Sequence, residues 1–246
     1  MPTGPTSPPP PPTPPLTPLP LPLFPLQTVL LPGVTLPLHV FEPRYRQLTV
    51  DLITGTVPEK RFGVVALAPS AGVEVTSLEQ LKPIGCAAIL RQAARLPDGR
   101  FDIVTLGEHR FRLLSVDPEA APYLMGTVEW LPDAPAMIPG QRMPDDTVVA
   151  LVASARAAYR RYCQAAWKQG DWTEPAEDVD VASLAHLLAT DCLLPLEDRQ
   201  RILEETRPLH RLRLVTRLLS REAGILATLH AIPAPPADLH QQAIEN

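Results

Sequence analysis

Ser70 has the type and setting of a candidate nucleophile, because it lies in the short segment Pro69-Ser70-Ala71-Gly72. A serine of this kind acts only with a base within hydrogen-bond reach, and a lysine is one such base. The chain has three lysines, at positions 60, 82 and 168, and none lies in a recognisable catalytic motif. We therefore expect a β-turn at this segment and retain a small hydrolase built on Ser70 only as the third of three hypotheses.

Other catalytic and metal-binding patterns are missing from the sequence. It has no Gly-Lys dipeptide and hence no P-loop, and no Gly-x-Ser-x-Gly, His-Glu-x-x-His or EF-hand spacing occurs. The six histidines are scattered, and Cys86, Cys163 and Cys192 lie far apart with no Cys-x-x-Cys. The sequence therefore predicts no catalytic residue, no metal site and no cofactor. It predicts buried, reduced thiols and a cytoplasmic location.

Three arginines spaced four residues apart, Arg213, Arg217 and Arg221, predict a basic stripe along one helix face. The stripe is either a solvated face that complements the helix dipole or a contact for an acidic partner or RNA. The net charge of −5 and the isoelectric point near 5.7 argue against general affinity for nucleic acid or anionic membranes. No apolar run approaches the roughly 20 residues of a spanning helix, so we expect no membrane association.

The elements around these residues divide the chain into five segments. Residues 1–20 are rich in proline, which lacks the N–H donor and fixes φ, so a polyproline or disordered tail is expected. Residues 21–131 carry short apolar runs broken by turn residues, which indicate a small antiparallel β-barrel. We expect a linker over 132–144, a helical bundle over 145–224 and a tail over 225–246. The predicted strands are Leu21–Leu23, Val34–Val40, Phe62–Ala68, Ile84–Arg95, Phe101–Leu106, Phe111–Val116 and Leu124–Trp130.

Local signals fix several element ends. Pro43 suits the first position of a helix, and Gly55 suits its end. The segment 96–99, Leu-Pro-Asp-Gly, is a hairpin signal. In the second half, apolar residues recur at helical spacing, and helices are expected over 145–166, 181–189, 196–206 and 209–223, the last ending at Gly224.

Several segments resemble one known family, the amino-terminal domain of Lon proteases. The resemblance rests on Leu21-Pro22-Leu23-Phe24-Pro25-Leu26-Gln27, on Leu36 to Tyr45 (LPLHVFEPRY), on Gly107 to Leu114, on Pro122 to Glu129 and on Leu193 to Gln200 (LLPLEDRQ), and it covers about residues 20–224. It implies an α+β fold in which a PUA-like small antiparallel β-barrel precedes a C-terminal α-helical bundle. It also implies a module that recognises polypeptides, here without the ATPase and protease domains of full-length Lon.

The first hypothesis is therefore a non-enzymatic polypeptide-binding module, an adaptor in protein quality control with unfolded clients and a protease as partners. An apolar groove between barrel and bundle is expected to hold the client, with Phe24, Leu26, His39, Phe41 and Tyr45 near it. The alternative is an RNA-binding PUA-like module, which the acidic composition disfavours.

The remaining family-motif residues, Glu42, Pro43, Arg44 and Arg110, are expected to maintain the fold. Glu42 and Arg110 are predicted to form a barrel-closing ion pair, and Arg44 to cap a carbonyl group.

Overall fold

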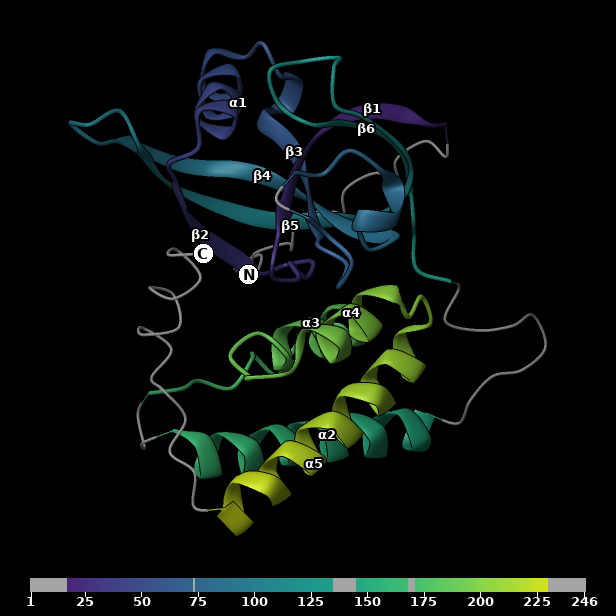
Figure 1. The fold of residues 1–246 in the computed structure, drawn as a ribbon. Coiled ribbons are helices and arrows are strands. Elements are labelled where there is room, and N and C mark those ends of the chain that lie inside the picture. The colour runs from purple at the N-terminus through teal and green to yellow at the C-terminus, as the bar shows by residue number, and fades with distance from the viewer. Residues whose placement is uncertain (1–16, 73, 135–144, 168–170, 230–246) are drawn as a thin grey trace, which may run out of the picture.

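The computed structural model describes residues 17–72, 74–134, 145–167 and 171–229. Most of each predicted tail and most of the predicted linker thus lie outside the described residues, while residues 19–20 belong to the first strand and residues 225–229 to the last helix. Along the chain the elements are β1 (Leu19–Leu26), β2 (Thr35–Val40), α1 (Pro43–Thr54), η1 (Pro58–Lys60), β3 (Arg61–Ala66), η2 (Leu78–Gln80), β4 (Ile84–Arg95), β5 (Phe101–Asp117), β6 (Met125–Trp130), α2 (Asp145–Ala166), α3 (Val181–Leu188), α4 (Leu196–Glu204) and α5 (Pro208–Leu229). Figure 1 shows the strands and α1 in one half and α2 to α5 in the other.

The six strands form a ring, which confirms the predicted barrel. Their order is β2-β5-β4-β3-β1-β6, and β5 also pairs with β6, so the sheet closes on itself. One pair departs from the expected antiparallel pattern, since β1 runs parallel to β3 with Leu23 opposite Gly63. The sheet is therefore mixed. Within the described residues β2 pairs on one side only, with β5, and it carries Pro37, whose missing N–H suits an unpaired edge.

Strand β5 replaces two predicted strands. The sequence predicted a turn at Gly107-Glu108, but the strand continues from Phe101 to Asp117. Gly107 allows the backbone at Leu31 to approach closely, because a Cβ at position 107 would lie 2.4 Å from the Leu31 carbonyl oxygen. The glycine therefore permits a close backbone crossing in a continuous strand rather than a turn. The predicted hairpin at 96–99 is confirmed, with Gly99 at φ +84°.

Helix α1 covers one end of the barrel. Pro43 occupies its start and Gly55 ends it with a left-handed φ of 84°, as the sequence predicted. Tyr45, Leu48 and Leu52 are buried on the face toward the strands. Burial of this apolar face holds the helix against the barrel, as Figure 1 shows.

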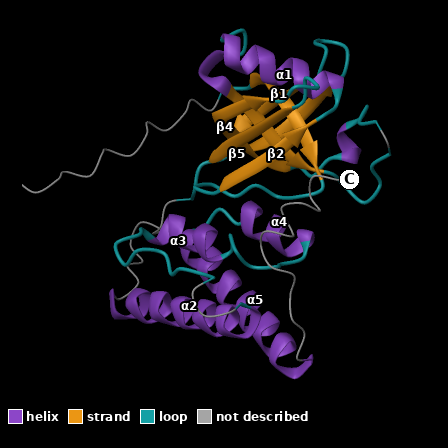
Figure 2. Cartoon of the chain, turned by 90° about the vertical axis from the view of Figure 1, so that its left-hand side faces the viewer, coloured by secondary structure: helices purple, strands orange, loops and turns teal. Residues whose placement is uncertain are grey.

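The helices α2 to α5 form the second half. Figure 2 shows the long helices α2 and α5 together, with α3 and α4 between them and the barrel. Asp180 caps α3 by accepting hydrogen bonds from the backbone N–H groups of Ala182 and Ser183 at 2.9 and 3.0 Å. The predicted stop at Gly224 is wrong, because α5 continues to Leu229. An exposed glycine in a helix interior weakens the helix without ending it.

Two arginines and one aspartate hold the halves together. Arg110 of β5 and Arg211 of α5 have side chains 3% and 0% exposed, and both pair with Asp133, which follows β6. Arg110 also donates to the Leu203 and Glu205 carbonyl oxygens at 2.9 Å. The predicted pair between Glu42 and Arg110 is therefore wrong. A buried guanidinium is stable only with acceptors close to it. Because β5 places Arg110 next to the helices, its acceptors come from there and from Asp133.

Two further contacts cross the same boundary. Lys82 pairs with Glu197 at 2.7 Å, and the Gln200 side-chain amide donates to the Ile84 carbonyl oxygen at 3.0 Å. One cluster of buried apolar side chains also extends from the barrel into the helices. All three cysteines are free and buried, as predicted. Among the described helices, none combines the length and apolar character needed to span a membrane.

Candidate functional site

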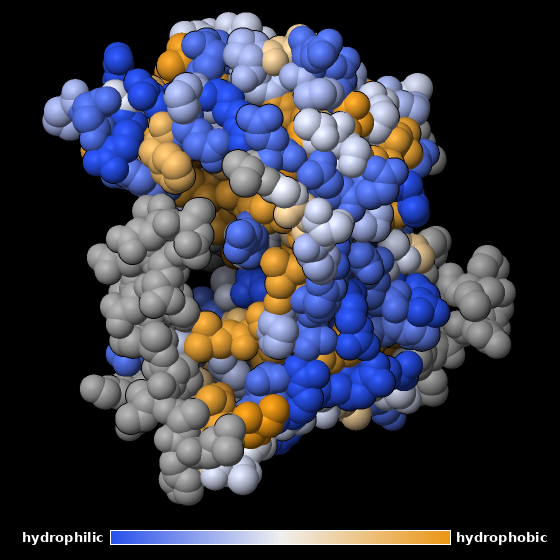
Figure 3. Space-filling view, viewed as in Figure 1, coloured by the Kyte–Doolittle hydropathy of each residue, from blue (hydrophilic) through white to orange (hydrophobic). Residues whose placement is uncertain are grey.

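A pocket of about 1020 Å³ lies where the barrel meets the helices. Its barrel side is formed by the end of β1, the loop after it and the whole of β2, and its helical side by residues around α3 and α4. Figure 3 shows apolar side chains gathered around a hollow at this level of the molecule. Residues on the barrel side include Phe24, Leu26, Thr28, Leu30, Leu36, Leu38, His39, Phe41 and Tyr45; those on the helical side are Trp167, Thr190, Asp191, Cys192, Leu193 and Arg199.

All five residues that the sequence placed near a binding groove line this pocket. They are not equally accessible. Phe24 and Tyr45 are 7% and 3% exposed and belong to the floor, whereas Phe41 is 46% exposed at the rim. Leu26 and His39 are half-buried. The structure thus brings these side chains together, and their role in binding stays a prediction.

The floor at one end of the pocket is a stack of flat groups. The Phe24 and Tyr45 rings lie 4.0 Å apart between centroids and are nearly parallel, at 11°. The Arg44 guanidinium lies 4.8 Å from the centroid of the Tyr45 ring, and Arg44 Nε donates to Glu42 at 2.9 Å. Arg44 was expected to cap a carbonyl group, so its observed pairing with Glu42 and Tyr45 corrects that expectation. Burial raises the pKa of Tyr45 to about 12, so its hydroxyl stays protonated at neutral pH.

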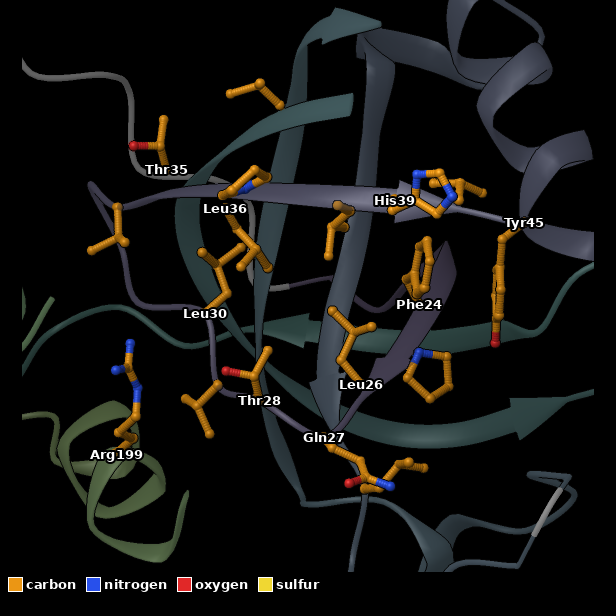
Figure 4. A pocket seen from close by; sticks show the side chains of 18 of the residues that line it. Phe24, Leu26, Gln27, Thr28, Leu30, Thr35, Leu36, His39, Tyr45 and Arg199 are labelled. Atoms are coloured by element: carbon orange, nitrogen blue, oxygen red, sulfur yellow. The ribbon is translucent and has the colours of Figure 1, made fainter. Parts of the chain in front are cut away.

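His39 is fixed in orientation by a carboxylate. Its Nδ1 lies 2.7 Å from Oδ1 of Asp102 on the neighbouring strand β5, and its ring centroid lies 6.5 Å from that of Phe41. Figure 4 shows His39, Phe24 and Tyr45 at one end of the pocket, and Leu30 and Thr35 toward the other. The lining offers aromatic and aliphatic surface with few fixed polar groups, which suits binding rather than covalent chemistry.

In the part of the chain that the structure describes, the candidate nucleophile Ser70 has no hydrogen bond to a lysine. The Ser70 hydroxyl donates to the Glu79 carbonyl oxygen at 3.2 Å, and Lys82 is engaged by Glu197. Lys168, the third lysine, lies outside the described residues. Among the described residues there is also no group of three or more His, Cys, Asp or Glu side chains placed to hold a metal ion.

The predicted basic stripe is divided. Arg221 pairs with Asp198 at 2.7 Å and also with Glu222, so its charge is largely neutralised. Arg213 and Arg217 line a second pocket of about 910 Å³, together with Arg207 and His210. Whether these side chains meet a partner stays a prediction.

Sequence reasoning missed the residues of the helical wall, Arg199 above all. The loop between α3 and α4 and the start of α4 bring this wall to the barrel. A signal was present, since Arg199 lies in the segment from Leu193 to Gln200 that carried the family resemblance. Asp133 was also missed, because it lies in a proline-rich stretch that reads as a linker.

A family model for the ATP-dependent protease La (LON) substrate-binding domain matches residues 20–221. Lon protease 1 of Thermus thermophilus is 30% identical over 83% of this chain and 25% of its own length. The Lon protease of Anaeromyxobacter dehalogenans is 28% identical over 84% of this chain and 24% of its own length. The chain thus spans about a quarter of the length of these curated relatives.

Two solved structures share the fold. The crystal structure of a Lon N-terminal domain protein from Xanthomonas campestris has a TM-score of 0.55 at 23% identity, covering 87% of this chain and 99% of that chain. The N-terminal domain of Mycobacterium avium complex Lon protease has a TM-score of 0.61 at 19% identity, covering 82% of this chain and 98% of that chain. Because the family model matches most of its length, the chain belongs to the ATP-dependent protease La (LON) substrate-binding domain family.

Proposed function

We propose that this protein binds unfolded polypeptide segments in the pocket between barrel and helices, as an adaptor that presents clients for proteolysis. The observation that carries the proposal is the pocket itself, which gathers the apolar residues of β1, β2 and the loop between them. Its volume of about 1020 Å³ lies at the upper limit of small-molecule pockets. Such a space accommodates several side chains of an extended segment.

The strand β2 contributes a second feature that suits a polypeptide. One edge of β2 has no partner strand among the described residues, and the whole strand lines the pocket. An extended segment can use the main-chain groups of such an edge while its side chains enter apolar space. This recognition depends little on client sequence, as expected of a protein that meets many unfolded chains.

Anisotropy titrations with a fluorescent unfolded client, such as a reduced and alkylated protein, test the proposal. Phe41→Ala is expected to weaken binding about tenfold, because loss of this exposed aromatic contact at the rim of the pocket costs about 1.4 kcal/mol. Ile53→Ala is the matched control, since Ile53 on α1 is 45% exposed, like Phe41 at 46%, but does not line the pocket.

Two results would contradict this proposal. One is equal binding of the client by wild type, Phe41→Ala and Ile53→Ala. The other is absence of client binding at tens of micromolar together with salt-sensitive binding of a mixed-sequence RNA, which would favour the alternative of an RNA-binding module.

A further inference from the structure

Arg199 is one of four charged residues that line the pocket, with Glu42, Arg44 and Asp191. Arg44 is paired with Glu42. Arg199 arises from α4 on the helical wall, and Figure 4 shows its guanidinium directed across the pocket toward Leu30 and β2. The same figure places Arg199 at the end of the pocket that lies away from Phe24, His39 and Tyr45. The pocket thus has an aromatic end, where Arg44 is paired with Glu42, and a second end that carries Arg199.

The hydrogen bonds of this guanidinium are incomplete. Its Nη1 donates to the Cys192 carbonyl oxygen over a long distance of 3.4 Å, and its buried Nε has no hydrogen-bond partner. The carboxylate of Asp191 lines the same pocket and acts on the charge of Arg199. Burial lowers the pKa of Arg199 from its ordinary value, and the nearby Cys192 and Asp191 partly offset that effect.

Arg199 is half-buried, and a buried Nε–H group without an acceptor is costly to maintain. Arginine remains protonated even when its pKa is lowered, so the cost is not relieved by loss of the proton. The planar fork of a guanidinium matches the two oxygens of a carboxylate, and the surrounding apolar groups strengthen such a contact by excluding water. Arg199 therefore has the chemistry of a receptor for a carboxylate that enters the pocket.

We propose that Arg199 binds the free α-carboxylate at the C-terminus of a polypeptide whose last residues are apolar. This inference rests on the proposed function, because it assigns a substrate class to the same pocket. A cation at one end of a pocket can bind the terminal carboxylate of a peptide, because no further residues follow that carboxylate and need space. An internal acidic residue would need space for the chain on both sides. The residues before the carboxylate then lie along Leu30, Leu26 and β2 toward the aromatic end.

The experiment uses one fluorescent peptide of about eight residues with an apolar C-terminal end, prepared as the free acid and as the C-terminal amide. Anisotropy titration of the full chain is expected to give affinity about tenfold to a hundredfold higher for the acid, as for a hydrogen bond to a charged group. Arg199→Met is expected to bind both forms equally, with the affinity of wild type for the amide. Arg213→Met, which alters an exposed arginine outside this pocket, is expected to keep the preference for the acid.

Equal affinity of wild-type protein for acid and amide would overturn the inference, and this comparison needs no variant to fold. A preference for the acid that persists in Arg199→Met would overturn it too. A third peptide, amidated but with an internal glutamate, separates the two carboxylate sources, and binding as tight as that of the acid would exclude the terminus as the specific ligand. Failure of all peptides and unfolded clients to bind would instead contradict the proposed function itself.

Discussion

Asp133 is the carboxylate that allows two arginines to be buried between barrel and helices. It accepts from Arg211 Nη1 and Nη2 at 2.8 and 2.7 Å and also from Arg110. Arg211 also donates to the Glu205 and Ala182 carbonyl oxygens, while its buried Nε has no hydrogen-bond partner among the described residues. A single negative charge and several carbonyl dipoles thus compensate two cations, which leaves the site sensitive to any loss of charge.

We expect Asp133→Asn to lower the free energy of unfolding by about 3 kcal/mol or more, because it leaves two buried guanidinium groups without a counter-ion. Glu197→Gln is the matched control, since it removes a pair that also joins barrel and helices but has a carboxylate 62% exposed. Its expected cost is below about 1 kcal/mol. Urea denaturation followed by circular dichroism measures both. Equal costs for the two variants would show that Asp133 has no special role.

His186 makes stability depend on pH through the same site. Burial, reinforced by the charges of Arg211 and Arg110, lowers the pKa of His186 well below its ordinary value of 6.5. The unfolded chain therefore takes up a proton below about pH 6.5 that the folded protein does not. We expect the free energy of unfolding to fall with decreasing pH from there, by about 1.4 kcal/mol per pH unit for this group.

Urea denaturation at about pH 7.5, 6 and 5 tests this dependence. Burial also lowers the pKa of His109, so the informative quantity is the difference in slope between wild type and His186→Gln. The exposed His210, changed to Gln, is the control and should keep the wild-type slope. An unchanged slope in His186→Gln would contradict the assignment.

At the scale of elements, the barrel depends on glycines where strands and side chains approach closely. Gly85 of β4 lies opposite Phe111 of β5. A Cβ on Gly85 would lie 2.3 Å from the Phe111 ring and 2.7 Å from the Val64 carbonyl oxygen. The absence of a side chain there lets the Phe111 ring fill the barrel interior.

We expect Gly85→Ala to destabilise the protein by about 1–3 kcal/mol through overpacking. Gly224→Ala is the opposite case, because no atom lies within 4 Å of its Cβ position and the residue is exposed within α5. This variant is expected to gain about 0.5–1 kcal/mol from helix propensity. Thermal and urea denaturation of both variants would give shifts of opposite sign. Shifts of the same sign would show that local space at these positions does not decide stability.

At the scale of the whole molecule, barrel and helices share one apolar cluster and the buried joint at Asp133. The pocket lies between the same two halves, so its shape depends on their staying together. Each half contains a fully buried cysteine whose thiol can report the unfolding of that half. Cys86 lies in β4 of the barrel, and Cys163 lies in α2 of the helical half.

We expect both thiols to become reactive over the same range of urea concentration, because shared burial makes the halves unfold together. Pulse labelling with a maleimide, read by mass spectrometry of each cysteine peptide, measures this. In Asp133→Asn the two midpoints should separate, whereas in Glu197→Gln they should coincide. Separate midpoints in the wild-type protein would show that the halves unfold independently.

The sequence by itself determined the class of fold and most element ends. Pro43 and Gly55 bound α1, residues 96–99 form the hairpin, and the change from short apolar runs to helical spacing separates barrel from helices. These features are local, because they depend on backbone dihedrals and on the period of burial within one element. The family resemblance also led to five residues, Phe24, Leu26, His39, Phe41 and Tyr45, that line a common pocket.

Only the tertiary structure decided which distant residues meet. The partner of Arg110 is Asp133 rather than Glu42, β5 passes through Gly107 without a turn, and Arg199 reaches the pocket from the helical side. Charge and hydropathy along a chain do not specify such contacts, because a buried ion pair or a close crossing depends on where several elements converge. The pocket is likewise built from both halves of the chain, so no pattern within one element specifies it.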